Sequence, residues 1–152
     1  LRDLFAWEVI GIEPNPQAVE IARSRGLEVH EGTLDSYMPS EPFDLVVLSH
    51  VLEHIPYPRS AMHKVKNLLR PGGRLIVLVP NAASVERRKF GPMWDAWDVP
   101  RHIHHFSPPS LRRLLGDFDI SLTFDWPERS NHILDHKIIL DLHHNSLQGL
   151  SS

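Results

Sequence analysis

The chain has 152 residues, the length of one domain with a substantial apolar core, and it contains no cysteine, which excludes disulfides, thiolate metal sites and a cysteine nucleophile. Its formal net charge of -3 gives it no global basic surface, so nucleic-acid binding is disfavoured. The sequence has neither an apolar stretch of about 18 residues nor an N-terminal signal pattern, so we expect a cytoplasmic protein with no membrane partner.

Strand-like and helix-like patterns alternate from residue 8 to about residue 124, which predicts an α/β fold with a mostly parallel sheet and flanking helices. The expected strands are 8–12, 27–31, 43–48, 75–79 and 118–124. The expected helices are 16–25, 58–70 and one that begins at Pro108. Since 43–48 and 75–79 are nearly continuous apolar runs, we expect both strands to be buried on both faces.

The first helix has clear start signals. Asn15 is a suitable N-cap, and Pro16 suits the first helical position because it has no N–H to leave unpaired. The spacing of the apolar residues predicts a buried face of Ala18, Ile21 and Ala22.

The segment 84–106 is longer than an ordinary connection between a strand and a helix, and we expect a lid-like insertion. It holds two tryptophans and three closely spaced histidines, namely Trp94, Trp97, His102, His104 and His105. A metal site is disfavoured, because no cysteine is present and few carboxylates lie near these histidines. We therefore expect no metal and assign the segment to shaping a substrate pocket, although the tryptophans could also simply pack it down.

The C-terminal part of the chain gives weaker signals. We divide the chain into a domain at 1–124 and an uncertain segment at 125–152. Within that segment, 137–142 fits either a strand or a helical turn.

Glu13 closes the first predicted strand, and a carboxylate at that position in an α/β sheet can accept hydrogen bonds from both ribose hydroxyls of a nucleotide cofactor. The alternative is a surface charge that caps the following helix. The matching glycine-rich loop should lie roughly 20 residues upstream of the carboxylate. Only twelve residues precede Glu13, and residues 1–7 hold no glycine. We therefore expect the glycine-rich half of the cofactor-binding site to be missing.

Polar residues also follow two later strands. Thr33 and Leu34 lie where a bound base would sit, or they form an ordinary turn. Ser49 and His50 follow the most apolar strand, at a strand end where ligands bind in such sheets, and are candidates for cofactor contact. His54 is a candidate general base near neutral pH, or it caps local backbone with its neighbours.

Several segments together resemble the class I S-adenosylmethionine-dependent methyltransferases, in the subgroup of quinone-biosynthesis O-methyltransferases. The segments are 9–14, 43–55 with Leu52-Glu53-His54, 69–80 with Pro71-Gly72-Gly73, and 90–107 with Pro100-Arg101-His102. The resemblance covers about residues 4–120 and implies a Rossmann-like fold with S-adenosylmethionine as the cofactor.

The resemblance also implies roles for individual residues. Glu13 would hold the ribose, and Thr33 and Leu34 would flank the adenine. Ser49 and His50 would lie near the methionine part of the cofactor. The segment 84–106 would cover a small-molecule acceptor. For an oxygen acceptor, His54 or His102 would be the catalytic base.

The chain departs from this family at its start, where the family's first strand and glycine-rich loop are expected to be missing. The missing strand would leave an empty position in the sheet. Either the strands on each side of this position close up, or apolar edges are left exposed and favour association, for example as a homodimer. Two alternatives to methyl transfer remain open here. One is a non-catalytic remnant or interaction module of the same fold, and the other is a nicotinamide-dependent oxidoreductase.

Overall fold

A computed structural model describes residues 7–116, 118–124 and 137–143. The chain divides into two compact units, Leu1–Ser40 and Glu41–Ser152, which are described in turn. Among the described residues, no helix is long and apolar enough to cross a membrane.

The first unit is a strand–helix–strand motif. Its elements are β1 (Ile10–Glu13), α2 (Pro16–Ser24) and β2 (Glu28–Glu31). The two strands pair in parallel, with Ile10 beside Glu28. The side chain of Asn15 accepts hydrogen bonds from the backbone N–H groups of Gln17 and Ala18, which confirms the predicted cap.

The predicted buried face of α2 is wrong in part. Val19 is the buried residue of the helix, whereas Ile21 is 54% exposed and Ala18 and Ala22 are half-buried. In its own unit the helix has only a two-stranded sheet to pack against, so a narrow stripe is covered rather than the full apolar face.

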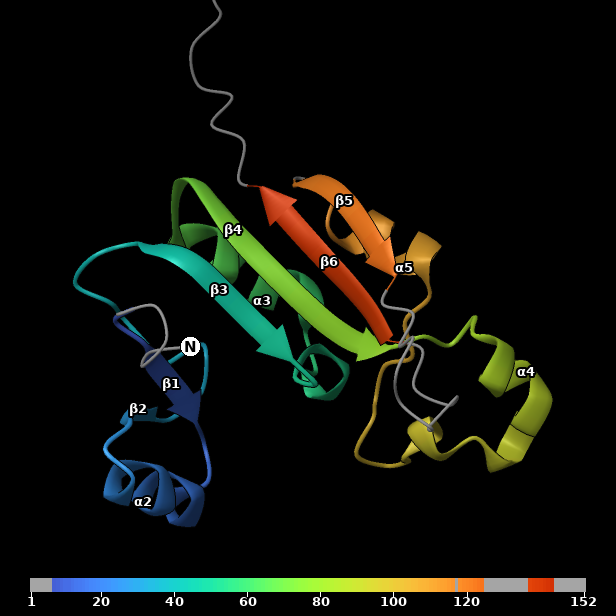
Figure 1. The fold of residues 1–152 in the computed structure, drawn as a ribbon, viewed down its shortest axis with the longest axis horizontal. Helices are drawn as coiled ribbons and strands as arrows, with labels where there is room; N and C mark the ends of the chain where they lie inside the picture. Colours follow the sequence, from blue (N-terminus) through green and yellow to red (C-terminus); the bar gives the residue numbers. More distant parts are fainter. Residues whose placement is uncertain (1–6, 117, 125–136, 144–152) are drawn as a thin grey trace, which may run out of the picture. The chain divides into compact units, whose positions relative to one another are not determined.

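The second unit is built on a four-stranded sheet in the order β3-β4-β6-β5, seen in Figure 1. Its strands are β3 (Phe43–Ser49), β4 (Leu69–Pro80), β5 (Asp119–Phe124) and β6 (Lys137–His143). The pair β3–β4 is parallel, and β6 lies antiparallel between β4 and β5. The segment for which strand and helical turn were both open is therefore a strand inside the sheet.

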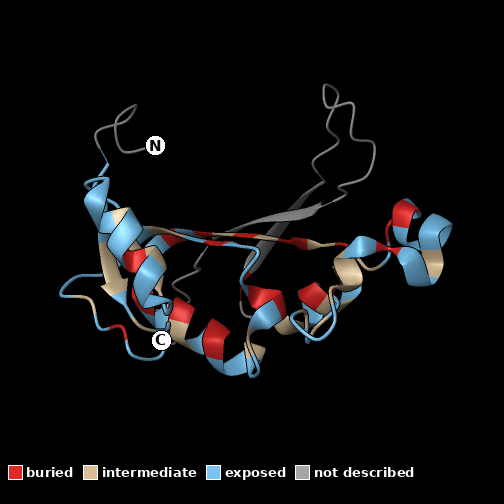
Figure 2. Ribbon diagram, turned by 90° about the horizontal axis from the view of Figure 1, so that it is seen from below, coloured by how far each residue is buried: buried red, intermediate tan, exposed pale blue. Residues whose placement is uncertain are grey.

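Two helices cover one face of this sheet, as Figure 2 shows. They are α3 (Pro58–Leu68) and α5 (Pro108–Leu114). The strand residues below them are fully buried, including Leu75, Val77 and Val79 at 0% exposed. Val47 is 47% exposed, so the expectation that β3 is buried on both faces is wrong. β4 likewise has one buried and one half-buried face, because no described helix of this unit covers the opposite side.

The helix α3 ends two residues earlier than predicted, because Leu69 already pairs with Phe43 in the sheet. The register shifts after this pair, and Pro71-Gly72-Gly73 forms an irregular excursion inside the strand. A Cβ on Gly73 would lie 2.9 Å from the carbonyl oxygen of Arg70 and 3.1 Å from that of Phe43. The backbone approaches so closely that only glycine fits at this position.

Among the described strands, β1 pairs with β2 and β3 pairs with β4, in two separate sheets. Because β1 and β3 belong to different units, the expectation that the strands on each side of the missing strand close up stays a prediction. Association through the free strand edges stays a prediction.

The segment between β4 and α5 holds α4 (Val85–Phe90) and two short 3-10 helices, Gly91–Met93 and Asp95–Trp97. Its two ends meet in a bridge between Asn81 and Phe106. Trp94 is buried and Trp97 donates its ring N–H to the Gly91 carbonyl at 2.8 Å, so the tryptophans do pack the segment down. Its role as a lid stays a prediction.

Candidate functional site

The carboxyl end of β3 leads into a tight turn that presents the predicted residues of this region. Ser49 is the last residue of the strand and is exposed. His50 follows with φ 54°, a left-handed conformation that turns the chain sharply. The 3-10 helix Leu52–His54 comes next, with Leu52 at 0% exposed anchoring it in the core.

Glu53 is the centre of a polar cluster. Its side chain is 1% exposed, and Oε1 accepts a hydrogen bond from Nδ1 of His50 at 3.2 Å. The same oxygen lies 3.9 Å from Nε2 of His102. The other oxygen, Oε2, is buried and has no hydrogen-bond partner among the described residues. Since burying a carboxylate with so few partners is unfavourable, this arrangement points to a functional role.

The backbone holds the insertion against this turn. The carbonyl of Glu53 accepts hydrogen bonds from the backbone N–H groups of Ile103 and His104, at 3.0 and 3.2 Å. Nδ1 of His54 donates to the carbonyl of Arg101 at 2.9 Å. These bonds bring His102 beside His54, with ring centroids 4.8 Å apart. Both residues predicted as catalytic therefore lie together.

The hydrogen bonds fix which ring nitrogens are available. A carbonyl can only accept, so Nδ1 carries the proton in His54, and likewise in His102, where it donates to the Ala96 carbonyl at 2.8 Å. In the neutral rings Nε2 is then the basic atom. Nε2 of His102 faces two carboxylates, Glu53 at 3.9 Å and Asp98 at 3.6 Å, and the His102 side chain is only 11% exposed, whereas His54 is exposed. His54 thus has the more accessible basic nitrogen.

The same donors could hold a divalent cation. Glu53, His54 and His102 each offer one ligand atom, and these atoms lie within 4.8 Å of one another. By contrast, the three histidines of the insertion do not gather around one point. Nε2 of His105 donates to the Trp97 carbonyl at 2.9 Å, and His104 faces the Pro56 carbonyl.

The remaining predicted residues belong to the first unit. Glu13 ends β1, and its Oε1 accepts a hydrogen bond from the backbone N–H of Asn15 at 2.8 Å, so the capping alternative accounts for one of its oxygens. Thr33 and Leu34 follow β2, with Thr33 in a turn closed by Ser36. Because β1 and β2 are parallel, all three residues lie at one edge of their sheet. A carboxylate at this edge has the chemistry that a ribose diol requires.

Two members of the cluster were not assigned a role from the sequence. Glu53 was considered as a local cap and as part of the Leu52-Glu53-His54 motif, and Asp98 only as a carboxylate near the histidines. The spacing His50-x-x-Glu53-His54 was a usable signal, because residues three and four apart on a helical turn share one face. Asp98 and His102 are four residues apart, so their spacing was a weaker signal of the same kind.

A family profile described as a methyltransferase domain matches residues 1–123. The chain belongs to this family. A ubiquinone biosynthesis O-methyltransferase of Photorhabdus laumondii is 27% identical over 158 residues, which cover 92% of this chain and 58% of that protein. The corresponding protein of Alkalilimnicola ehrlichii is 37% identical over 79 residues, covering 45% of this chain and 31% of the relative. The resemblance seen in the sequence is confirmed, and the chain spans little more than half the length of such relatives.

Solved methyltransferases share the fold. A SAM-dependent methyltransferase from Archaeoglobus fulgidus superposes with a TM-score of 0.73 at 16% identity, covering 93% of this chain and 78% of that structure. The N-methyltransferase NodS from Bradyrhizobium japonicum, solved with S-adenosyl-L-homocysteine, gives 0.61 at 17% identity and covers 89% and 65%. The methyltransferase domain described here is therefore Rossmann-like, as predicted.

Proposed function

We propose that this chain is the catalytic part of an S-adenosylmethionine-dependent methyltransferase that methylates a hydroxyl oxygen of a small molecule. The observation that carries the proposal is the cluster of Glu53, His54 and His102 at the carboxyl end of β3. Ligands of open α/β sheets bind at such strand ends. When bound, S-adenosylmethionine supplies a methyl group that its sulfonium already activates.

The residues at the strand ends suit the cofactor. Glu13 would bind the ribose, Thr33 and Leu34 would flank the adenine, and Ser49 and His50 would line the path to the methionine part. The exposure of Ser49 and His50 supports this, since neither side chain is used by the core.

An oxygen acceptor is supported by the basic nitrogen of His54. A hydroxyl becomes a good nucleophile when it loses its proton, and Nε2 of His54 can accept that proton while Nδ1–H holds the ring against Arg101. His102, whose Nε2 faces Glu53 and Asp98, is the second candidate for this role. Two relatives named as O-methyltransferases agree with this choice of atom.

The other features of the proposal follow from the same site. The acceptor is a small molecule, and residues 84–106 would cover it. We place the protein in the cytoplasm, with a homodimer through free strand edges as its assembly. The family match favours methyl transfer over a nicotinamide-dependent reaction.

The test is transfer of a radiolabelled methyl group from S-adenosylmethionine to a panel of phenols and catechols. His54→Asn should lower kcat by roughly 100-fold, the lower range for a lost general base, with KM little changed. The matched control is His63→Asn, an exposed histidine of α3 outside the cluster; its kcat should stay within about two-fold of the wild type. Cofactor binding without transfer to any hydroxyl acceptor would favour the alternative of a non-catalytic interaction module.

A further inference from the structure

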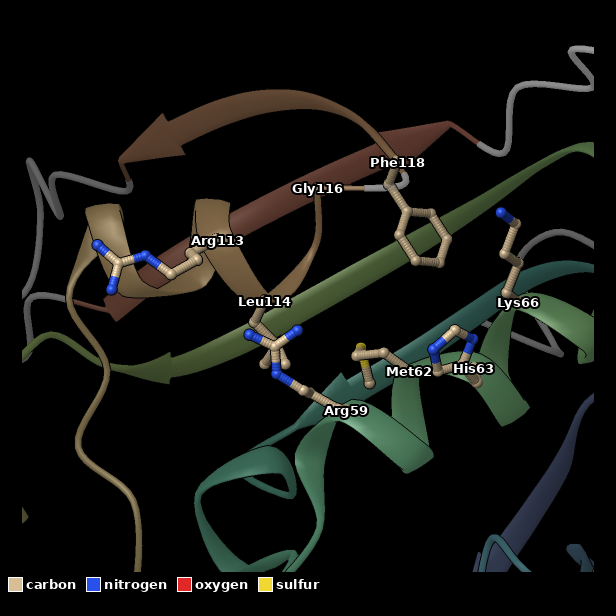
Figure 3. Close-up of a pocket in the computed structure, with 8 residues that line it drawn as sticks. All are labelled: Arg59, Met62, His63, Lys66, Arg113, Leu114, Gly116 and Phe118. Carbon is tan, nitrogen blue, oxygen red and sulfur yellow. The ribbon is translucent and has the colours of Figure 1, made fainter.

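A cavity lies in the second unit, between α3 and the end of α5, as Figure 3 shows. Its accessible volume is about 100 Å³. The residues that line it are Arg59, Met62, His63, Lys66, Arg113, Leu114, Gly116 and Phe118. None of these residues belongs to the cluster around Glu53, so methyl transfer does not account for the cavity.

The rim of this cavity is cationic. Arg59 and Lys66 come from α3 and Arg113 from α5, and none of these three side chains has a salt bridge with another described residue. No carboxylate is among the described residues that line the cavity. Arg59, His63 and Lys66 are spaced by four and three residues, so they form one stripe of the helix, where like charges repel. Such a cluster is unexpected in a chain with a net charge of -3.

The floor of the cavity is apolar and ordered. Met62 is 4% exposed and Phe118 is 7% exposed, so both are fixed in the core below the cationic rim. Charges above an apolar floor are less well solvated than charges on an open surface, which strengthens their attraction for an anion. The cavity therefore combines a floor of low polarity with three cations that form no salt bridge within the described part of the chain.

We propose that this cavity binds a phosphate group. Two guanidinium groups can each offer paired N–H donors to phosphate oxygens, and an ammonium group supplies a further point charge. The volume suits one tetrahedral anion rather than a nucleotide. The phosphate group comes either from a small phosphorylated molecule or from a lipid headgroup, and the apolar floor would accept the adjoining carbon chain of either.

The test is a titration of the whole chain with inorganic phosphate at constant ionic strength, followed by ³¹P NMR line broadening. We expect saturable binding. Arg113→Gln should weaken it roughly ten-fold, the effect of losing one charge-assisted contact. The matched control is Arg112→Gln, which removes the same charge from the neighbouring position of α5 outside the cavity. It should change the affinity by less than about two-fold.

A second arm distinguishes the two sources of phosphate. Both variants are sedimented with vesicles of phosphatidylcholine alone or with phosphatidic acid. Binding of free phosphate that depends on Arg113 assigns the site to a small phosphorylated ligand. Vesicle binding that depends on Arg113, without binding of free phosphate, assigns it to a lipid headgroup. Equal losses in Arg113→Gln and Arg112→Gln, or no binding in either arm, would overturn the proposal. Thermal unfolding of each variant controls for folding.

Discussion

The buried carboxylate of Glu53 gives the most specific prediction about the site. Glu53→Gln keeps the shape of the side chain and removes its charge. The charge gains one hydrogen bond, from His50 at 3.2 Å, and a longer contact with His102 at 3.9 Å, while Oε2 has no partner among the described residues. A hydrogen bond to a charged group contributes about 1.5–3 kcal/mol. Burial of an ion costs several kcal/mol, so the charge is a net loss to stability.

We therefore expect Glu53→Gln to raise the free energy of unfolding by about 1 kcal/mol. Turnover should move in the opposite direction and fall roughly ten-fold or more, because the negative charge that faces Nε2 of His102 is removed from the cluster. Urea denaturation and the methyl-transfer assay measure the two effects.

The matched control is Glu86→Gln, a carboxylate that is also buried, at 3% exposed, but lies in α4 outside the cluster. Its turnover should stay within about two-fold of the wild type. The reasoning is refuted if Glu53→Gln destabilises the protein by more than about 1.5 kcal/mol with turnover unchanged, since Glu53 would then be a structural ion-pair residue.

Two further predictions concern the sheet and the cluster. Gly73→Ala should lower the free energy of unfolding by about 1–3 kcal/mol, because its Cβ would lie 2.9 Å from a backbone oxygen. Gly72→Ala, with φ 77° and open space around the Cβ, should lower it by only about 1 kcal/mol. Urea denaturation measures both, and the opposite ranking would contradict the register of β4. Treatment with a chelator and desalting should change turnover by less than about two-fold if Nε2 of His54 acts as the base; a loss that zinc restores would show that Glu53, His54 and His102 hold a cation instead.

The sequence predicted the local features of the fold well, because caps and apolar spacing are local signals. Asn15 caps α2 as expected, and Ser107 caps α5 in a capping box with Ser110. Burial was predicted less well, since it depends on which partner covers each face. Val47 and Ile21 are apolar and exposed because no described element of their own unit lies over them.

In the candidate site, too, individual residues were predicted from the sequence, whereas their long-range contacts were not. His54 and His102 were named as alternative bases for an oxygen acceptor, and the structure places them in one cluster. Their contact depends on a hydrogen bond between His54 and Arg101, which lie 47 positions apart in the chain. Neither periodicity nor spacing indicates the long-range contact between Glu53 and His102, so the cluster as a whole was not predicted. The cation-lined cavity was missed for the same reason, because its rim joins two separate helices.

The most direct test of the account is calorimetric titration of this chain with S-adenosyl-L-homocysteine, the product of methyl transfer, which requires no acceptor. The account predicts saturable binding at one site per chain, weakened at least roughly ten-fold in Glu13→Gln, because a neutral amide replaces the carboxylate that accepts from the ribose hydroxyls. Absence of binding, or equal affinity in the wild type and Glu13→Gln, would contradict the cofactor site described here.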